Sequence, residues 1–116
     1  MTQREVTFTT EQIAAYAEAS GDHNPIHLDD GFAKTVGLPG VIAHGLLQMG
    51  MMATAAAEAA GGPQHLKRLY CRFAGMVVPG DTVIFTAQPD GHGKLALAAV
   101  NQRGEPVLTK SFAEIG

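Results

Sequence analysis

The sequence is poor in cysteine and in aromatic residues, and it carries no excess of positive charge. Its 116 residues include one cysteine and no tryptophan, and aromatic side chains make up 6% of the chain. A single cysteine excludes a disulfide within the chain and is typical of a reducing compartment. The formal net charge of −3, from 8 basic and 11 acidic residues, argues against nucleic acid as a partner.

Leader-like segments and long hydrophobic segments are also missing. Residues 1–5 contain no apolar core of a secretory signal. The apolar segment over residues 44–58 is shorter than the roughly 20 residues that a membrane helix needs. We therefore expect a cytoplasmic protein with no membrane partner. The 46% of apolar residues predicts a globular chain, and its length predicts a single domain over residues 1–116.

Helical patterns come first in the chain. Residues 5–9 alternate as a short strand, and Thr9 with Gln12 is a capping box for a helix that ends at Ser20 and Gly21. A second short helix is expected over residues 29–36, before Gly37. The apolar face of the first helix is expected to consist of Ile13, Ala14, Tyr16 and Ala17.

The segment VIAHGLLQMGMMATAAAEAAGG predicts a helix of about 16 residues that is apolar on every side. A helix of this kind is expected to be buried on every side. Strand patterns follow over residues 66–78, 82–88, 94–101 and 106–112, with short turns between them, which indicates antiparallel neighbours. The predicted fold class is therefore α+β, with an antiparallel sheet wrapped around one central apolar helix.

The stretch SGDHNPIHLDD, residues 20–30, has the strongest chemical signal. Pro25 favours an extended Asn24, which suits an N-cap, and begins a tight turn that contains His27. Asp22 lies just before that turn. A carboxylate and an imidazole placed in this way can converge on one small volume and share a water molecule.

Three other readings of this stretch compete. His23 and His27 have the spacing of a metal site on a helix, although Pro25 interrupts such a helix and no third ligand stands at a telling position. The acidic and amide side chains can also serve only as caps and turn formers. A hydrolytic triad would need Ser20 or Cys71 as nucleophile. Ser20 lacks the context of a nucleophile elbow, and Cys71 lies in a predicted strand.

The block SGDHNPIHLDD, followed by VIAHGLLQMG, closely resembles the MaoC-like family of hot-dog-fold proteins. This family contains the (R)-specific enoyl-CoA hydratases, and the (3R)-hydroxyacyl-ACP dehydratase subunits of fatty-acid synthesis are related to it. The similarity covers about residues 7–52 and resumes in RLYCRFAGMVVPGDTV. The two blocks together, at this separation, are far more specific than either block alone.

The resemblance implies a role for each matching residue. Asp22 and His27 would hold and activate one water molecule, Asn24 would support their geometry, and the Gly45 N–H would bind the thioester carbonyl oxygen. Neither a metal nor another cofactor is implied. Around the substrate we expect Ala43, His44 in a structural role, Met49, and Ala53 in place of a serine that family members often carry.

The expected activity is reversible hydration of trans-2-enoyl thioesters to (3R)-3-hydroxyacyl thioesters. The alternatives are a non-catalytic, acyl-thioester-binding subunit and a hot-dog thioesterase. The expected partners are an acyl-CoA or acyl-ACP substrate and a second hot-dog chain, in a homodimer or a heterodimer. A second chain is expected because the central helix has no polar face and residues 95–100 show little alternation.

Overall fold

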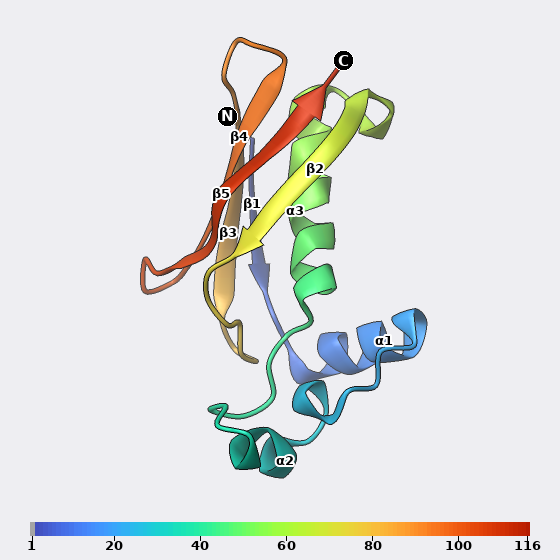
Figure 1. The fold of residues 1–116 in the computed structure, drawn as a ribbon, viewed down its shortest axis with the longest axis vertical. Helices are drawn as coiled ribbons and strands as arrows, with labels where there is room; N and C mark the ends of the chain where they lie inside the picture. The colour runs from blue at the N-terminus through green and yellow to red at the C-terminus, as the bar shows by residue number, and fades with distance from the viewer. Residues whose placement is uncertain (1) are drawn as a thin grey trace.

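The computed structural model describes residues 2–116 as one antiparallel sheet with a long helix packed on one face (Figure 1). The molecule measures 47 × 29 × 19 Å, so it is thin for its length. This arrangement confirms the α+β prediction. The strands are β1 (Thr2–Thr7), β2 (Leu66–Phe73), β3 (Thr82–Pro89), β4 (Lys94–Asn101) and β5 (Pro106–Ile115); the helices are α1 (Thr10–Ser20), η1 (Pro25–His27), α2 (Asp30–Thr35), α3 (Gly45–Ala60) and η2 (Pro63–His65).

The five strands lie in the order β1-β3-β4-β5-β2, and all neighbours are antiparallel. In β4 the two leucines, Leu95 and Leu97, point into the core, while Ala96 and Ala98 are exposed on the outer face. The expectation of little alternation in this strand was therefore wrong. It overlooked that the outward positions are alanines, which expose little apolar surface.

The 16-residue helix α3 forms as predicted, but only one of its faces is buried. Met52, Ala55 and Ala56 are fully buried against the sheet, whereas Leu46 is 67% exposed. The prediction of burial on every side was wrong for the single chain. An apolar composition does not state how many layers surround a helix, and here the sheet covers one side only.

Local capping explains how α1 begins. The Thr9 hydroxyl accepts a hydrogen bond from the Gln12 N–H at 3.0 Å, which confirms Thr9 as the N-cap. Ile13 and Ala17 are buried and Tyr16 is half-buried, as expected. Ala14 is exposed, so its placement on the apolar face was wrong. At 3.6 residues per turn, Ala14 lies farther around the helix from the centre of this face than Ile13, Tyr16 or Ala17 does.

The strand predicted over residues 66–78 ends at Phe73. At Gly75 an added Cβ would lie 3.0 Å from the Pro106 carbonyl oxygen, so the chain passes close to β5 there. The chain then leaves the sheet, and the Val77 carbonyl oxygen accepts a hydrogen bond from the Ala43 N–H at 2.7 Å. This bond joins the end of the strand region to the segment that leads into α3.

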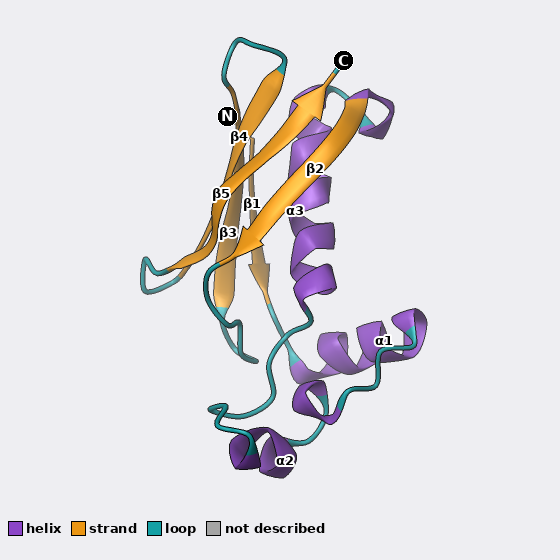
Figure 2. Ribbon diagram, viewed as in Figure 1, coloured by secondary structure: helices purple, strands orange, loops and turns teal. Residues whose placement is uncertain are grey.

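The helices that precede α3, namely α1, η1 and α2, gather at one end of the sheet. Figure 2 shows α1 and α2 beyond the N-terminal end of α3, while both chain termini lie at the opposite end of the sheet. Within the part of the chain that is described, no helix is long and apolar enough to cross a membrane. The chain between α1 and α3 lies at the end of the sheet opposite to the two termini.

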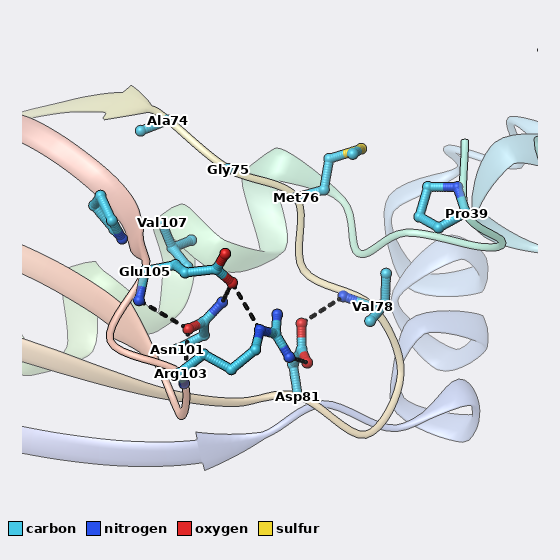
Figure 3. A pocket seen from close by; sticks show the side chains of 11 residues that line it. Pro39, Ala74, Gly75, Met76, Val78, Asp81, Asn101, Arg103, Glu105 and Val107 are labelled. Carbon is cyan, nitrogen blue, oxygen red and sulfur yellow. Dashed lines mark hydrogen bonds and ion pairs between the residues drawn. The ribbon is translucent and has the colours of Figure 1, made fainter. Parts of the chain in front are cut away.

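A polar clamp ties the segment before β3 to the turn between β4 and β5, beside a cavity of about 580 Å³ (Figure 3). The Asp81 carboxylate accepts hydrogen bonds from Gln102 at 3.0 Å, from the Val78 N–H at 3.1 Å and from Arg103 at 3.3 Å. Burial alone would raise the pKa of Asp81. The three hydrogen bonds and the charge of Arg103 outweigh burial, so this pKa lies below its ordinary value.

We predict that Asp81→Asn lowers the free energy of unfolding at pH 7 by roughly 1.5–3 kcal/mol, because hydrogen bonds to a buried charge are lost. A lowered native pKa stabilises the fold above the unfolded pKa of about 3.9, and this contribution is lost as the pH falls through the native value. The difference between wild type and Asp81→Asn should therefore shrink in acid. Urea unfolding at pH 7 and pH 3 measures it, with Glu5→Gln, at an exposed position of β1 outside this clamp, as control. An equal difference at both pH values would contradict the assignment.

Candidate active site

A series of short side-chain caps builds the loop between α1 and η1. Gly21 ends α1 in the left-handed conformation at φ 77°. The Ser20 hydroxyl then accepts from the Asp22 N–H at 3.2 Å, and the Asp22 carboxylate accepts from the Asn24 N–H at 3.3 Å. The Asn24 side chain accepts from the Ile26 N–H at 3.1 Å, which confirms it as the N-cap of η1. These side chains therefore do act as caps and turn formers, and this role alone leaves the burial of His27 unexplained.

His27 lies inside the protein at 8% exposure, and a backbone carbonyl fixes its ring. Because a carbonyl oxygen only accepts, the ring Nδ1–H donates to the Ile42 oxygen, at 2.7 Å. The Ile42 N–H in turn donates to the Ile26 oxygen at 3.1 Å. This pair of bonds holds η1 against the segment before α3. In neutral His27 the Nε2 atom therefore carries a lone pair and can accept a proton.

His44 is buried behind His27, with 1% of its surface exposed. Its ring stacks on His27 with 3.8 Å between the ring centroids and an interplanar angle of 23°. The His44 Nε2–H donates to the backbone oxygen of Asp22 at 3.1 Å, and Tyr16 packs edge-on at 4.8 Å. The structure thus brings two residues of the first sequence block together with one residue of the second.

One ligand-type atom from each of Asp22, His27 and His44 lies within 4.8 Å of the others, which is a composition that can hold a metal ion. The stacking of the two rings opposes such a site, because lone pairs in nearly parallel rings do not converge on one point. His23, the other candidate ligand, is exposed, and its Nε2 lies 3.5 Å from the Glu18 carboxylate. The arrangement suits proton transfer between a carboxylate and an imidazole better than metal binding.

Gly45 begins α3 directly beside this cluster. The first N–H groups of a helix have no partner within the helix and carry partial positive charge. The N-cap residue, His44, makes no side-chain cap to them, so they remain available to an acceptor. A Cβ on Gly45 would lie 3.3 Å from the ring of Phe73. The glycine therefore admits this aromatic ring beside the helix start.

The other predicted substrate residues have different positions. Ala43 is buried, and its backbone bonds to Val77 and Gln48, so its side chain is part of the packing. Met49 and Ala53 are half-buried on α3. Ala53 borders an apolar groove of about 480 Å³, lined by Ala53, Thr54, Ala57, Glu58, Gly62, Pro63 and Leu66. That this groove takes the acyl chain stays a prediction.

Neither candidate nucleophile has the surroundings of a catalytic one. Ser20 is the exposed last residue of α1, and its hydroxyl caps the following loop. Cys71 is half-buried against the core on the inner face of β2. Burial raises the pKa of the Cys71 thiol, which disfavours the reactive thiolate.

Sequence reasoning missed three groups of the site: the Ile42 carbonyl, Tyr16 and the Phe73 ring. A backbone carbonyl has no signal in a sequence. Tyr16 was identified only as part of an apolar helix face, and its contact with His44 depends on how α1 meets α3. Phe73 lies in a predicted strand, where an aromatic residue is ordinary.

Comparison with known proteins identifies the family. The family model described as "MaoC like domain" matches residues 1–109. The peroxisomal hydratase-dehydrogenase-epimerase of Neurospora crassa is 36% identical over 107 residues, 92% of this chain and 12% of that protein. The peroxisomal enoyl-CoA hydratase 2 of Arabidopsis thaliana is 36% identical over 91 residues, 77% of this chain and 29% of that protein.

Solved structures agree. A MaoC-like dehydratase from Phytophthora capsici superposes with a TM-score of 0.88 at 29% identity, covering 98% of this chain and 39% of that one. The R-hydratase PhaJ1 of Pseudomonas aeruginosa has a TM-score of 0.80 at 28% identity, covering 97% of this chain and 76% of that one. The chain therefore belongs to the MaoC-like domain family and has its hot-dog fold. It spans less than a third of either curated relative.

Proposed function

We propose that this domain is a hydro-lyase that interconverts trans-2-enoyl and (3R)-3-hydroxyacyl thioesters. The observation that carries the proposal is the meeting of Asp22 and His27 beside the open N-terminal end of α3. The names of relatives support it, since they include a peroxisomal enoyl-CoA hydratase and an R-hydratase.

In the hydration direction, the Asp22 carboxylate and His27 Nε2 hold one water molecule and take a proton from it. The water oxygen then bonds to C3 of the enoyl thioester, and the electron pair of the double bond moves toward the carbonyl. The proton returns to C2 from the pair, so that one molecule of water is added in total. Because two close titratable groups act as a unit, the pair as a whole is the acid and base.

The carbonyl oxygen of the thioester gains negative charge when C3 is attacked. The Gly45 N–H, at the positive end of α3, is the donor that we assign to this oxygen. In the dehydration direction the same groups act in reverse: the pair removes the C2 proton and protonates the departing hydroxyl group. The carrier, coenzyme A or an acyl carrier protein, takes no part in these steps.

Incubation with crotonyl-CoA tests the activity against its two rivals. Loss of the enoyl absorbance indicates hydration, and chiral analysis of the product tests the (3R) configuration. Release of free thiol would indicate a thioesterase. Binding with neither change would indicate a non-catalytic subunit.

Asp22→Asn and His27→Ala should each lower kcat by roughly a hundredfold or more, as expected for positioned acid and base groups. The double variant should be little worse than either single one, because the two residues act together. His23→Ala is the matched control, since this histidine is exposed in the same loop and should leave kcat unchanged. Near-normal turnover in either single variant would refute the assignment of the water-activating pair.

A pair of substitutions at Gly45 isolates the N–H group. Gly45→Ala adds a Cβ and keeps the N–H, whereas Gly45→Pro adds a Cβ and removes the N–H. Proline is favoured in the first turn of a helix, and the preceding His44 has φ −60° and ψ 139°, which a following proline accepts. Both variants should therefore fold.

Relative to Gly45→Ala, we expect Gly45→Pro to lower kcat by roughly a hundredfold to a thousandfold, the usual effect of losing one oxyanion donor. Steady-state kinetics on crotonyl-CoA measures the ratio, and thermal unfolding checks that both chains are folded. Equal kcat values in two folded variants would show that this N–H does not bind the reacting oxygen.

We further propose that a second hot-dog unit covers the exposed side of α3. The motivation is the exposed apolar surface near the site, where Leu46 is 67%, Phe73 47% and Met76 51% exposed. In addition, β2 is an edge strand, with one side free to pair with another strand. An exposed apolar patch beside an open strand edge is typical of an interface.

Light scattering after size exclusion should therefore show a dimer of this chain, and Leu46→Glu should shift it toward the monomer. The charge would lie in the apolar interface, while the fold of the single chain should tolerate it at an exposed position. Leu28→Glu, at an exposed leucine in the loop before α2, is the control and should not change the mass. A fully active monomeric wild type would contradict the proposal, and activity only after addition of a related subunit would favour a heterodimer.

A further inference from the structure

One buried ring, His44, contacts or adjoins every group that the proposed reaction uses. It stacks on His27 at 3.8 Å, donates from Nε2 to the Asp22 carbonyl oxygen at 3.1 Å, and directly precedes Gly45 in the chain. We propose that His44 is a positioning residue, which sets the relative placement of the Asp22 carboxylate and the His27 ring. This inference rests on the proposed function and adds to it the residue through which the pair is assembled.

The hydrogen bond to Asp22 is the first reason. Residues 21–25 are all exposed, so packing does not fix this loop. The bonds from the Asp22 N–H to Ser20 and from the Asn24 N–H to Asp22 span two residues each and shape the loop only locally. The bond from His44 spans 22 residues and ties Asp22 to the start of α3. It is therefore the link, among the hydrogen bonds described for Asp22, that places the carboxylate relative to the helix.

The stack on His27 is the second reason. The Ile42 carbonyl fixes the Nδ1 side of the His27 ring, but one hydrogen bond leaves the ring free to rotate about that bond. The face of His44, held in turn by the edge of Tyr16, restricts this rotation. Two contacts therefore set the direction of the His27 Nε2: the hydrogen bond to Ile42, in the plane of the ring, and the stack on His44, on its face.

The hydrogen bonding of the His44 ring nitrogens is the third reason. Its Nε2 carries the hydrogen that it donates, and its Nδ1 is buried with no hydrogen-bond partner. His44 serves as a fixed donor and as a surface for His27, and it takes no part in the chemistry itself.

Two variants separate the two contacts. His44→Phe keeps a flat ring against His27 and loses the donor to Asp22, and His44→Gln keeps a donor and loses the ring. We expect each to lower kcat by about tenfold, the effect of losing roughly one hydrogen bond or stacking contact. KM should change by less than about twofold, because a side chain at 1% exposure cannot contact the substrate.

A residue that only stabilises the fold would behave differently. Leu95→Ala is the control for lost stability, because it leaves a cavity in the core at the end of β4 away from the site. It should lower the thermal midpoint at least as much as the His44 variants, with kcat unchanged per folded molecule. If the unfolded fraction accounts for the whole loss of kcat in the His44 variants, so that kcat per folded molecule is unchanged, the positioning role is refuted.

A nuclear magnetic resonance measurement keeps the test independent of turnover. The His27 Nδ1–H, bonded to the Ile42 oxygen, should exchange slowly with water in the wild type. It should exchange at least tenfold faster in His44→Gln, because the ring is then free to leave its carbonyl. If wild type does not turn over crotonyl-CoA, the proposed function fails, and this exchange rate still decides the positioning role. An unchanged rate in the folded His44→Gln protein would overturn it.

Discussion

The packing of α3 against one face of the sheet is the constraint on which the rest of the structure depends. Its core residues are small or flexible, so the helix lies close to the strands, and its long axis runs along them (Figure 1). Its first turn consequently emerges at the end of the sheet where α1 and α2 gather. The unpaired N–H groups of that turn are a fixed positive end, and the polar residues of the site collect around it.

Backbone groups do much of the work that side chains do in other acid–base sites. The Ile42 carbonyl orients His27, and the Asp22 carbonyl accepts a hydrogen bond from the His44 Nε2–H. Two hydrogen bonds between the segment of Ile42 and Ala43 and its neighbours, one to Ile26 and one to Val77, hold this backbone in place. Substitutions that leave every named side chain intact could therefore still disturb the site by moving residues 41–44.

What the sequence predicted well was local. Thr9 and Asn24 act as caps because a cap depends on neighbours within three residues, and those are visible in the chain. The five-stranded antiparallel sheet and the helix α3 also agree with the periodicity. The family resemblance implied that Asp22 and His27 act together with the Gly45 N–H, and in the structure they lie beside His44, the residue before Gly45.

What failed depended on contacts between distant segments. The strand after α3 ends at Phe73, and the chain beyond it bonds through Val77 to Ala43, a partner 34 residues earlier that no local pattern reveals. The face of α3 that meets the sheet could not be chosen, because apolar residues occupy all sides. The stacking of His44 on His27 is likewise a product of tertiary structure, set by where two loops cross.

The position of the two termini determines where further polypeptide could be joined to a domain of this fold. Both ends of the chain leave from the end of the sheet opposite to α1, α2 and the start of α3 (Figure 1). Sequence added at either end extends away from the site and leaves its entrance unobstructed. The matching segment of the Neurospora crassa relative makes up 12% of that protein, so there it lies within a much longer polypeptide.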